Sequence, residues 1–145
     1  MYVFSARIPP SCTIRGEGVC LERDPGFSLI EVAFAVLVPG GKRAGTVVYR
    51  NLSRRRRSAE IGIELYPEYR GCGLGPRAIR AFLGYLFDTM RLRRVWLRVL
   101  PDNERAIRCY EKCGFRRVGY GKAYLFVPCL VMEITDEEFR REVRD

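Results

Sequence analysis

Three glycines alternate in the segment RGCGLG at residues 70–75, which lies between a strand-like run at residues 61–65 and a helical pattern that begins at Pro76. Because glycine has no side chain, the backbone N–H groups of such a loop can turn toward one anion, and the helix that follows presents the positive end of its dipole. The order of strand, glycine turn and helix therefore predicts a site for the pyrophosphate of a nucleotide-like cofactor.

Two other glycine motifs compete for this segment. Residues 73–78 fit the Gly-x-Gly-x-x-Gly/Ala dinucleotide fingerprint. In a dinucleotide fold, however, the first glycine follows the strand almost directly, whereas residues 66–70 intervene here. A P-loop is excluded because no Gly-Lys-Ser/Thr follows and no residue of the loop would hold magnesium. The pattern that remains is Gln/Arg-x-x-Gly-x-Gly/Ala, from Arg70 to Gly75.

This pattern resembles the pyrophosphate loop of the GNAT superfamily of acetyl-CoA-dependent N-acetyltransferases. The resemblance continues through SAEIGI at 58–63, YPEY at 66–69, LPDNERAI at 100–107 and YEKCGF at 110–115, and it covers the chain from about Arg43 to Glu138. These motifs most resemble those of the RimJ/RimL-like branch, which includes ribosomal-protein alanine N-acetyltransferases. The resemblance implies a mixed α/β fold with a mostly antiparallel central sheet, flanking helices, and strands that splay where the pantetheine arm of acetyl-CoA enters.

Length and composition fit a small enzyme of this kind. A chain of 145 residues can form one domain with its own core, so we expect a single N-acetyltransferase domain over residues 1–145. The longest apolar stretch, residues 32–38, is far shorter than the ~20 residues that span a bilayer, and the start of the chain lacks a signal-peptide layout. The six cysteines form no Cys-x-x-Cys pair, and there is no histidine. We expect a cytoplasmic protein with free thiols, no membrane and no metal.

Positive charge is the strongest compositional feature. The net charge is +9, and all but three of the 26 basic residues are arginines, which favours anionic partners such as coenzyme A. The run Arg54, Arg55, Arg56 and Arg57 falls in a turn between two strand-like segments. It is either a solvated hairpin loop or a docking site for a ribosome or another acidic partner, and no aromatic residue is interleaved with it to strengthen the second interpretation.

Hydrophobic periodicity predicts the elements that position the loop. Strands at 29–38, 45–52 and 58–65 form an antiparallel meander, and an amphipathic helix over 76–91 follows, with Pro76 at its first position. A strand at 95–99 precedes a second helix, which Asp102 or Asn103 caps and Gly114 ends. Strands at 116–126 and 129–134 complete the sheet, and a capping box, Thr135 with Glu138, begins a short final helix.

The N-terminal half departs from the family pattern. Family members usually carry two helices between their first and second strands, and these helices wall the acceptor site. Here only residues 1–28 precede the second strand, and prolines and glycines interrupt any helix between possible short strands at 1–6 and 19–23. A half shortened in this way implies an open acceptor groove, a wall supplied by the second subunit of a homodimer, or lost catalysis.

The chemistry that the resemblance implies needs a base, because the attacking amine must lose a proton. Glu60 matches the acidic position that acts as base in several family members, and Glu64 has the same strand parity, so both carboxylates are candidates. The alternative for Glu60 is a structural ion pair.

The remaining roles are a proton donor and a set of cofactor contacts. Tyr110 occupies the place of the family's general acid, although its hydroxyl could instead satisfy a buried polar contact. Backbone N–H groups around Leu65 and Tyr66 would stabilise the oxyanion, and Asn103 would contact the pantetheine arm, cap a helix, or do both. Pro76 supplies no N–H for phosphate, and Cys72 is interpreted as a small loop filler. The residues predicted to bind the cofactor are Leu65, Tyr66, Arg70, Gly71, Cys72, Gly73, Leu74, Gly75, Asn103 and Tyr110.

These inferences predict transfer of an acetyl group from acetyl-CoA to a primary amine, such as a protein N-terminus. Two alternatives remain: acetylation of a small-molecule amine such as an aminoglycoside or polyamine, and a non-catalytic module that binds coenzyme A or associates with the ribosome. The net positive charge argues against a polycationic acceptor, which would prefer an acidic groove.

Overall fold

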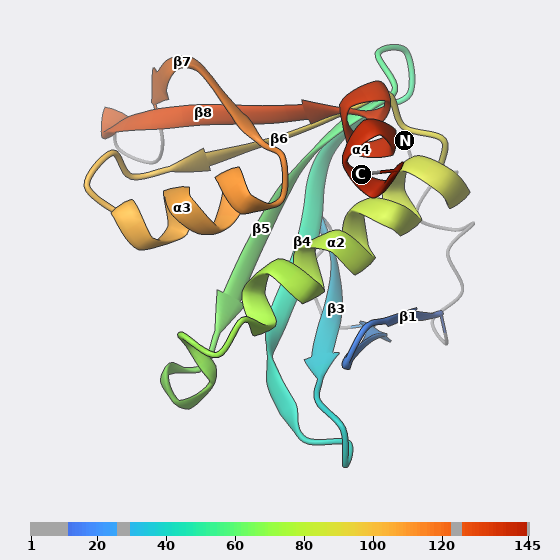
Figure 1. Cartoon of the computed structure of the whole chain (residues 1–145). Coiled ribbons are helices and arrows are strands. Elements are labelled where there is room, and N and C mark those ends of the chain that lie inside the picture. The colour runs from blue at the N-terminus through green and yellow to red at the C-terminus, as the bar shows by residue number, and fades with distance from the viewer. Residues whose placement is uncertain (1–11, 26–29, 123–125, 145) are drawn as a thin grey trace.

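The computed structural model describes residues 12–25, 30–122 and 126–144. Within them one eight-stranded sheet has the order β1-β2-β3-β4-β5-β6-β8-β7, and its neighbours are antiparallel except for the parallel pair β5 and β6 (Figure 1). The strands are β1 (Thr13–Gly16), β2 (Val19–Asp24), β3 (Glu31–Leu37), β4 (Arg43–Ser53), β5 (Ser58–Leu65), β6 (Arg94–Val99), β7 (Arg116–Lys122) and β8 (Pro128–Thr135). The helical elements are η1 (Pro67–Tyr69), α2 (Leu74–Gly84), η2 (Tyr85–Thr89), α3 (Glu104–Lys112) and α4 (Asp136–Arg144).

The helix α2 covers one face of the sheet and forms the core with it (Figure 1). Side chains of alternating residues on a strand point to the same face, and on this face Phe34, Tyr49 and Ile61 are buried. Phe82 of α2 packs edge-on against Phe34, with ring centroids 5.4 Å apart. The apolar stripe predicted for this helix is therefore core, as expected.

The sheet opens between β5 and β6. Their parallel pairing covers only Ser58↔Arg94, Ala59↔Val95 and Glu60↔Trp96, after which the two strands diverge. The start of α2 and the helix α3 flank this opening (Figure 1). The predicted splay in a mostly antiparallel sheet is confirmed.

A hairpin of β1 and β2 packs against α2, and no helix precedes η1 in the described part of the chain. The possible strand at residues 1–6 lies outside the described residues.

The homodimer prediction assumed apolar surface left uncovered near residues 29–38, and in the described part of that segment Ile30, which precedes β3, is 77% exposed. No residue of β3 is exposed, and small side chains such as Ala33 and Ala35 occupy the face of β3 opposite α2. A larger group of exposed apolar side chains lies around the edge strand β7 and comprises Val118, Tyr120, Phe126 and Val127.

Several boundaries differ in informative ways. The helix α2 begins at Leu74, so Pro76 is its third residue and not its first, because Gly73 takes a left-handed conformation (φ 79°) and ends the loop earlier. Asn103, and not Asp102, caps α3, since its Oδ1 accepts from Ala106 N at 3.2 Å. The reciprocal bonds of the capping box are present: Thr135 N donates to Glu138 Oε1 at 2.9 Å, and Glu138 N to Thr135 Oγ1 at 3.2 Å.

None of the described helices is long and apolar enough to cross a membrane.

Candidate active site

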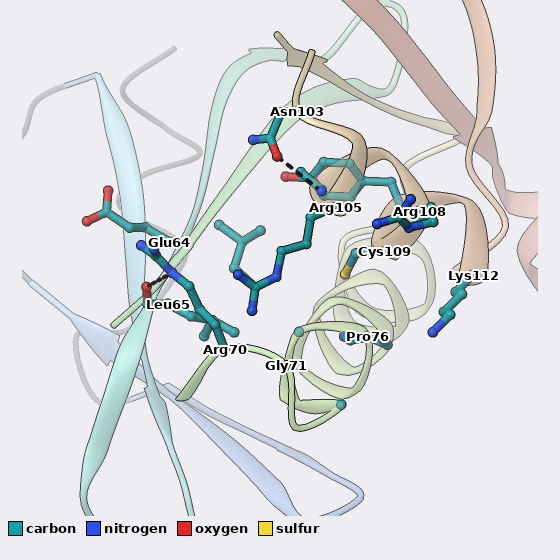
Figure 2. A pocket seen from close by; sticks show the side chains of 15 residues that line it. Glu64, Leu65, Arg70, Gly71, Pro76, Asn103, Arg105, Arg108, Cys109 and Lys112 are labelled. Atoms are coloured by element: carbon teal, nitrogen blue, oxygen red, sulfur yellow. Dashed lines mark hydrogen bonds between the residues drawn. The ribbon is translucent and has the colours of Figure 1, made fainter. Parts of the chain in front are cut away.

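A pocket of about 500 Å³ lies in the opening of the sheet (Figure 2). Three segments meet there: the end of β5, the glycine loop with the start of α2, and one side of α3. Its lining consists of Ile63, Glu64, Leu65, Arg70, Gly71, Gly73, Gly75, Pro76, Asn103, Arg105, Ala106, Arg108, Cys109, Tyr110 and Lys112. The structure thus brings the predicted loop and the predicted tyrosine to one cavity.

The loop needs glycine for two reasons: its backbone conformation and its short distance to α3. Gly71 and Gly73 have φ values of 78° and 79°, a region that side chains disfavour. A Cβ on Gly71 would lie 3.3 Å from Arg105 Nη2, and one on Gly75 would lie 3.1 Å from Cys109 Sγ. The backbone of the loop therefore approaches α3 closely, and the N–H groups that open α2 are left for an anion.

Three of the predicted cofactor residues do not line the pocket with the rest. Leu74 is buried in the core, so only its backbone N–H remains a candidate donor. Cys72 is exposed, and its thiol donates to Tyr69 O at 3.0 Å, which agrees with a loop filler. The N–H of Tyr66 donates to Ala44 O at 2.8 Å.

The bond from Tyr66 corrects one part of the predicted oxyanion site. The N–H and C=O groups of successive residues on a strand point to opposite sides. Because the Tyr66 N–H donates to Ala44 O on the β4 side, the backbone N–H and C=O groups of Leu65 and Ile63 point toward the opening. The sheet occupies the Tyr66 donor, and the donor role of Leu65 stays a prediction.

Basic side chains surround the pocket, and the sequence interpretation missed three of them. Arg105, Arg108 and Lys112 come from α3 and join Arg70, whose Nε donates to Leu65 O at 3.1 Å. Figure 2 shows Arg105 extending toward the glycine loop. Arg105, Arg108 and Lys112 are spaced i, i+3 and i+7, as residues on one face of a helix are, and this regular spacing was the signal available in the sequence.

Tyr110 is 8% exposed and packs edge-on against Phe115, with ring centroids 5.8 Å apart. Its hydroxyl has no hydrogen-bond partner among the described residues, so the alternative of a satisfied buried contact is not observed there. Burial, helped by the neighbouring thiols of Cys109 and Cys113, raises the pKa of Tyr110 to about 12. The hydroxyl therefore keeps its proton at neutral pH and is able to donate it.

Cys109 also lines the pocket, and the sequence interpretation passed over it as well. A hydrogen bond from the Cys113 thiol lowers the pKa of Cys109 against the opposing effect of burial, and the charges of Lys112 and Arg80 act in the same direction as the bond.

The two candidate bases have opposite surroundings. Glu60 is completely buried outside the pocket lining, and it accepts from Asn51 Nδ2 at 2.8 Å, from Arg98 Nε at 2.8 Å and from Arg50 Nη2 at 3.4 Å. Glu64 lies on the same sheet face, is exposed and lines the pocket. These contacts favour the structural ion pair for Glu60. A base role for either residue stays a prediction.

Coenzyme A fits the residues of this pocket. Backbone donors and four cations suit a carrier with several phosphates, and the open edge of β5 suits the amide groups of its arm. Asn103 lines the pocket while it caps α3, so both of its predicted roles are compatible. No group of three or more metal ligands occurs within the described residues.

Comparisons with known proteins agree with this geometry. The family model described as "Acetyltransferase (GNAT) domain" matches residues 21–116. Spermidine N(1)-acetyltransferase of Escherichia coli is 39% identical over 75 residues, which are 52% of this chain and 40% of that protein. N-alpha-acetyltransferase RimI of Mycobacterium tuberculosis is 35% identical over 91 residues, 59% of this chain and 55% of that protein.

A solved structure of a mutant spermidine N-acetyltransferase, SpeG, from Vibrio cholerae superimposes with a TM-score of 0.73 at 26% identity, and it covers 80% of this chain and 72% of that one. The predicted acyl-CoA N-acyltransferase fold is thereby confirmed. The match to the Escherichia coli relative spans well under half of that protein's length. With the family match extending from the second strand to the start of the seventh, the chain belongs to the GNAT acetyltransferase family.

Proposed function

We propose that this protein is an N-acetyltransferase that moves an acetyl group from acetyl-CoA to a primary amine. The observation that carries the proposal is the Tyr110 hydroxyl, which has no partner within the described residues and lies in the same pocket as the glycine loop and four basic side chains. Family membership supports the reaction class.

The residues that would hold acetyl-CoA follow from their positions. The backbone of Gly71, Gly73 and Gly75 faces the pyrophosphate, and Arg105, Arg108 and Lys112 supply positive charge for the phosphates. The free edge of β5 at Ile63 and Leu65 pairs with the amide groups of the pantetheine arm. When bound, acetyl-CoA supplies a thioester carbonyl for attack by the amine.

The chain itself contributes proton transfer and orientation. The N–H of Leu65 points into the opening, where it donates to the carbonyl oxygen of the acetyl group. Tyr110 donates its proton to the departing sulfur, which its raised pKa permits throughout the physiological range. Glu64, which is exposed at the pocket, takes the proton of the amine through water. Its side chain points away from Arg105 (Figure 2). Glu60 holds the strands together.

The scarcity of acidic residues in the pocket lining favours an acceptor that carries one positive charge, such as a peptide N-terminus. Of the pocket-lining residues, four are basic and Glu64 is acidic, and the nearby carboxylates of Glu31 and Glu60 are paired with Arg50. A polyamine would need several carboxylates in a row. The second candidate is nevertheless a polyamine, because the chain resembles spermidine N-acetyltransferases.

Release of the coenzyme A thiol, followed with a panel of amines, tests the proposal. The panel contains a peptide with a free N-terminus, the same peptide acetylated at that position, spermidine and kanamycin. We expect turnover with the free peptide and none with the blocked one. Greater turnover with spermidine would favour the polyamine candidate. Binding of acetyl-CoA without turnover of any amine would indicate a non-catalytic module.

We also propose a homodimer, supported by the exposed apolar side chains at the edge strand β7. Tyr120 and Phe126 are 79% and 78% exposed, which is unusual for large aromatic side chains on the surface of a monomer. Light scattering of the wild type and of a Tyr120→Ser, Phe126→Ser variant tests this assembly. A wild type that stays monomeric at high concentration, with and without acetyl-CoA, contradicts it.

A further inference from the structure

Two arginine-rich turns that are separate in the sequence lie side by side at one end of the sheet. The turn at residues 54–57 joins β4 to β5, and the segment at residues 91–94 leads into β6. The N–H groups of Arg93 and Arg94 both donate to Arg57 O, at 2.6 and 3.2 Å. This pairing gathers Arg54, Arg55, Arg56, Arg57, Arg91, Arg93 and Arg94, which we call the arginine cluster.

The arginine cluster faces solvent. All of its members are exposed except Arg94, which is half-buried and pairs with Glu133 at 2.7 Å. Arg57 and Arg91 have φ values of 53° and 60°. Because glycine or asparagine would adopt that conformation at lower cost, arginine at both turns indicates that the charge itself is useful there.

An aromatic ring lies directly beside the arginine cluster, although none is near residues 54–57 in the sequence. The tryptophan of β6, Trp96, is flanked by Arg94 and Arg98, whose guanidinium carbons are 5.7 and 5.8 Å from its ring centroid. A hollow of about 320 Å³ joins the ring to the cluster, and it is lined by Asn51, Ser53, Arg56, Ser58, Arg94, Trp96 and Val131.

We propose that the arginine cluster and Trp96 bind a single-stranded nucleic acid. Arginines supply contacts to phosphates, and an aromatic face next to them supplies stacking for a base, which is how proteins hold single strands without reading their sequence. The polar side chains of the hollow suit the edge of a base. A membrane surface or an acidic peptide would use the charge, but neither carries a flat polar base to fill the hollow beside the ring.

This site is separate from the candidate active site. The strand β5 runs from the arginine turn at Ser58 to the pocket at Leu65, so the two sites lie at opposite ends of that strand (Figure 1). The inference therefore does not rest on the proposed function, and variants in the arginine cluster leave acetyl transfer unchanged.

The chain offers a direct probe, because Trp96 is its one tryptophan. Labelled oligouridylate of about 12 nucleotides, a length within the range that single-strand sites cover, is titrated by fluorescence anisotropy, and quenching of the tryptophan emission is recorded in parallel. We expect both signals to saturate with the same Kd. Oligothymidylate in a second arm distinguishes an RNA site from one that accepts DNA equally.

Variants separate charge from stacking. Arg55→Ser with Arg56→Ser should weaken binding and make the slope of log affinity against log salt shallower by about 1.4, because each of the two phosphates left without its arginine accounts for roughly 0.7 of the slope. Arg15→Ser with Arg141→Ser is the control, because both arginines are exposed outside the cluster and the charge change is the same. Trp96→Leu should weaken oligouridylate binding by about 5-fold or more while leaving heparin binding unchanged.

Four results would overturn the proposal. They are no oligonucleotide binding at low salt, saturation of anisotropy without quenching of Trp96, equal losses in the control and cluster variants, and binding to phosphatidylserine vesicles in place of the oligonucleotides. If Trp96→Leu fails to fold, the quenching of the wild type still decides between stacking and charge alone.

Discussion

Replacing Glu60 by glutamine separates the two roles open to this residue. Its carboxylate accepts from Asn51 Nδ2 at 2.8 Å and from Arg98 Nε and Nη2 at 2.8 and 3.1 Å, with Arg50 Nη2 at 3.4 Å. Glutamine keeps one oxygen, but its NH₂ group faces donors where the second carboxylate oxygen stood. Glu60→Gln therefore removes the charge and places donor against donor in a fully buried position.

The expected loss follows from these contacts. A hydrogen bond to a charged group contributes about 1.5–3 kcal/mol. The side chains of Arg50 and Arg98 are 27% and 31% exposed, so both can turn partly toward water and reduce the cost. We therefore expect the free energy of unfolding to fall by about 2–3 kcal/mol, a large share of the ~5–15 kcal/mol typical of a domain. For a chain of this size the loss corresponds to a Tm lower by roughly 5–10 °C.

Urea unfolding followed by circular dichroism measures this loss, and Glu64→Gln is the matched control. Glu64 lies on the same strand and face but is exposed, so its replacement should change the free energy of unfolding by less than about 0.5 kcal/mol. If Glu60 is a structural residue, the folded Glu60→Gln variant should keep nearly the kcat of the wild type. A Glu60→Gln protein that is as stable as the wild type but loses acetyl transfer, most strongly at low pH, would refute the ion-pair reasoning and identify Glu60 as the base.

Three further outcomes are expected. Tyr110→Phe should lower kcat by ~100-fold or more while acetyl-CoA affinity stays within a few-fold and Tm is unchanged; an unchanged kcat when chemistry limits turnover would make Tyr110 a packing residue. Gly73→Asp should abolish acetyl-CoA binding in a titration of folded protein, whereas Gly73→Asn, with a similar shape and no charge, should bind better; equal affinity of wild type and Gly73→Asp would sink the loop assignment. At Glu138, burial raises the pKa, but hydrogen bonds from Thr135 and Arg116 outweigh it and lower the pKa overall. The stabilisation by Glu138 is then full above its unfolded-state pKa and is lost as pH falls through the lower folded value, so urea unfolding should show Glu138→Gln less stable than wild type at pH 7, with a deficit that shrinks as the pH falls below the unfolded-state pKa; a deficit that does not change with pH would contradict this linkage.

Local rules predicted the features that depend on a few neighbouring residues. Alternation of apolar residues predicted the strands, and the spacing of Thr135 and Glu138 predicted a capping box whose bonds are present. The alternating glycines predicted a tight turn between a strand and a helix, and in the structure Gly71 and Gly73 adopt left-handed backbone, which few other residues do. These rules act over one or two turns of chain, so they can be applied without the fold.

The tertiary structure decided the features that depend on which distant segments meet. Glu60 had two possible roles until strand register placed it between Arg50 of β4 and Arg98 of β6. Trp96 lies beside the arginine turn only because β6 pairs with β5 over three residues. Local sequence does not specify such meetings, because the register of a sheet is set by the sum of many weak contacts along its strands and across its core. The charges that surround a carboxylate or a ring are therefore known only once the sheet has formed.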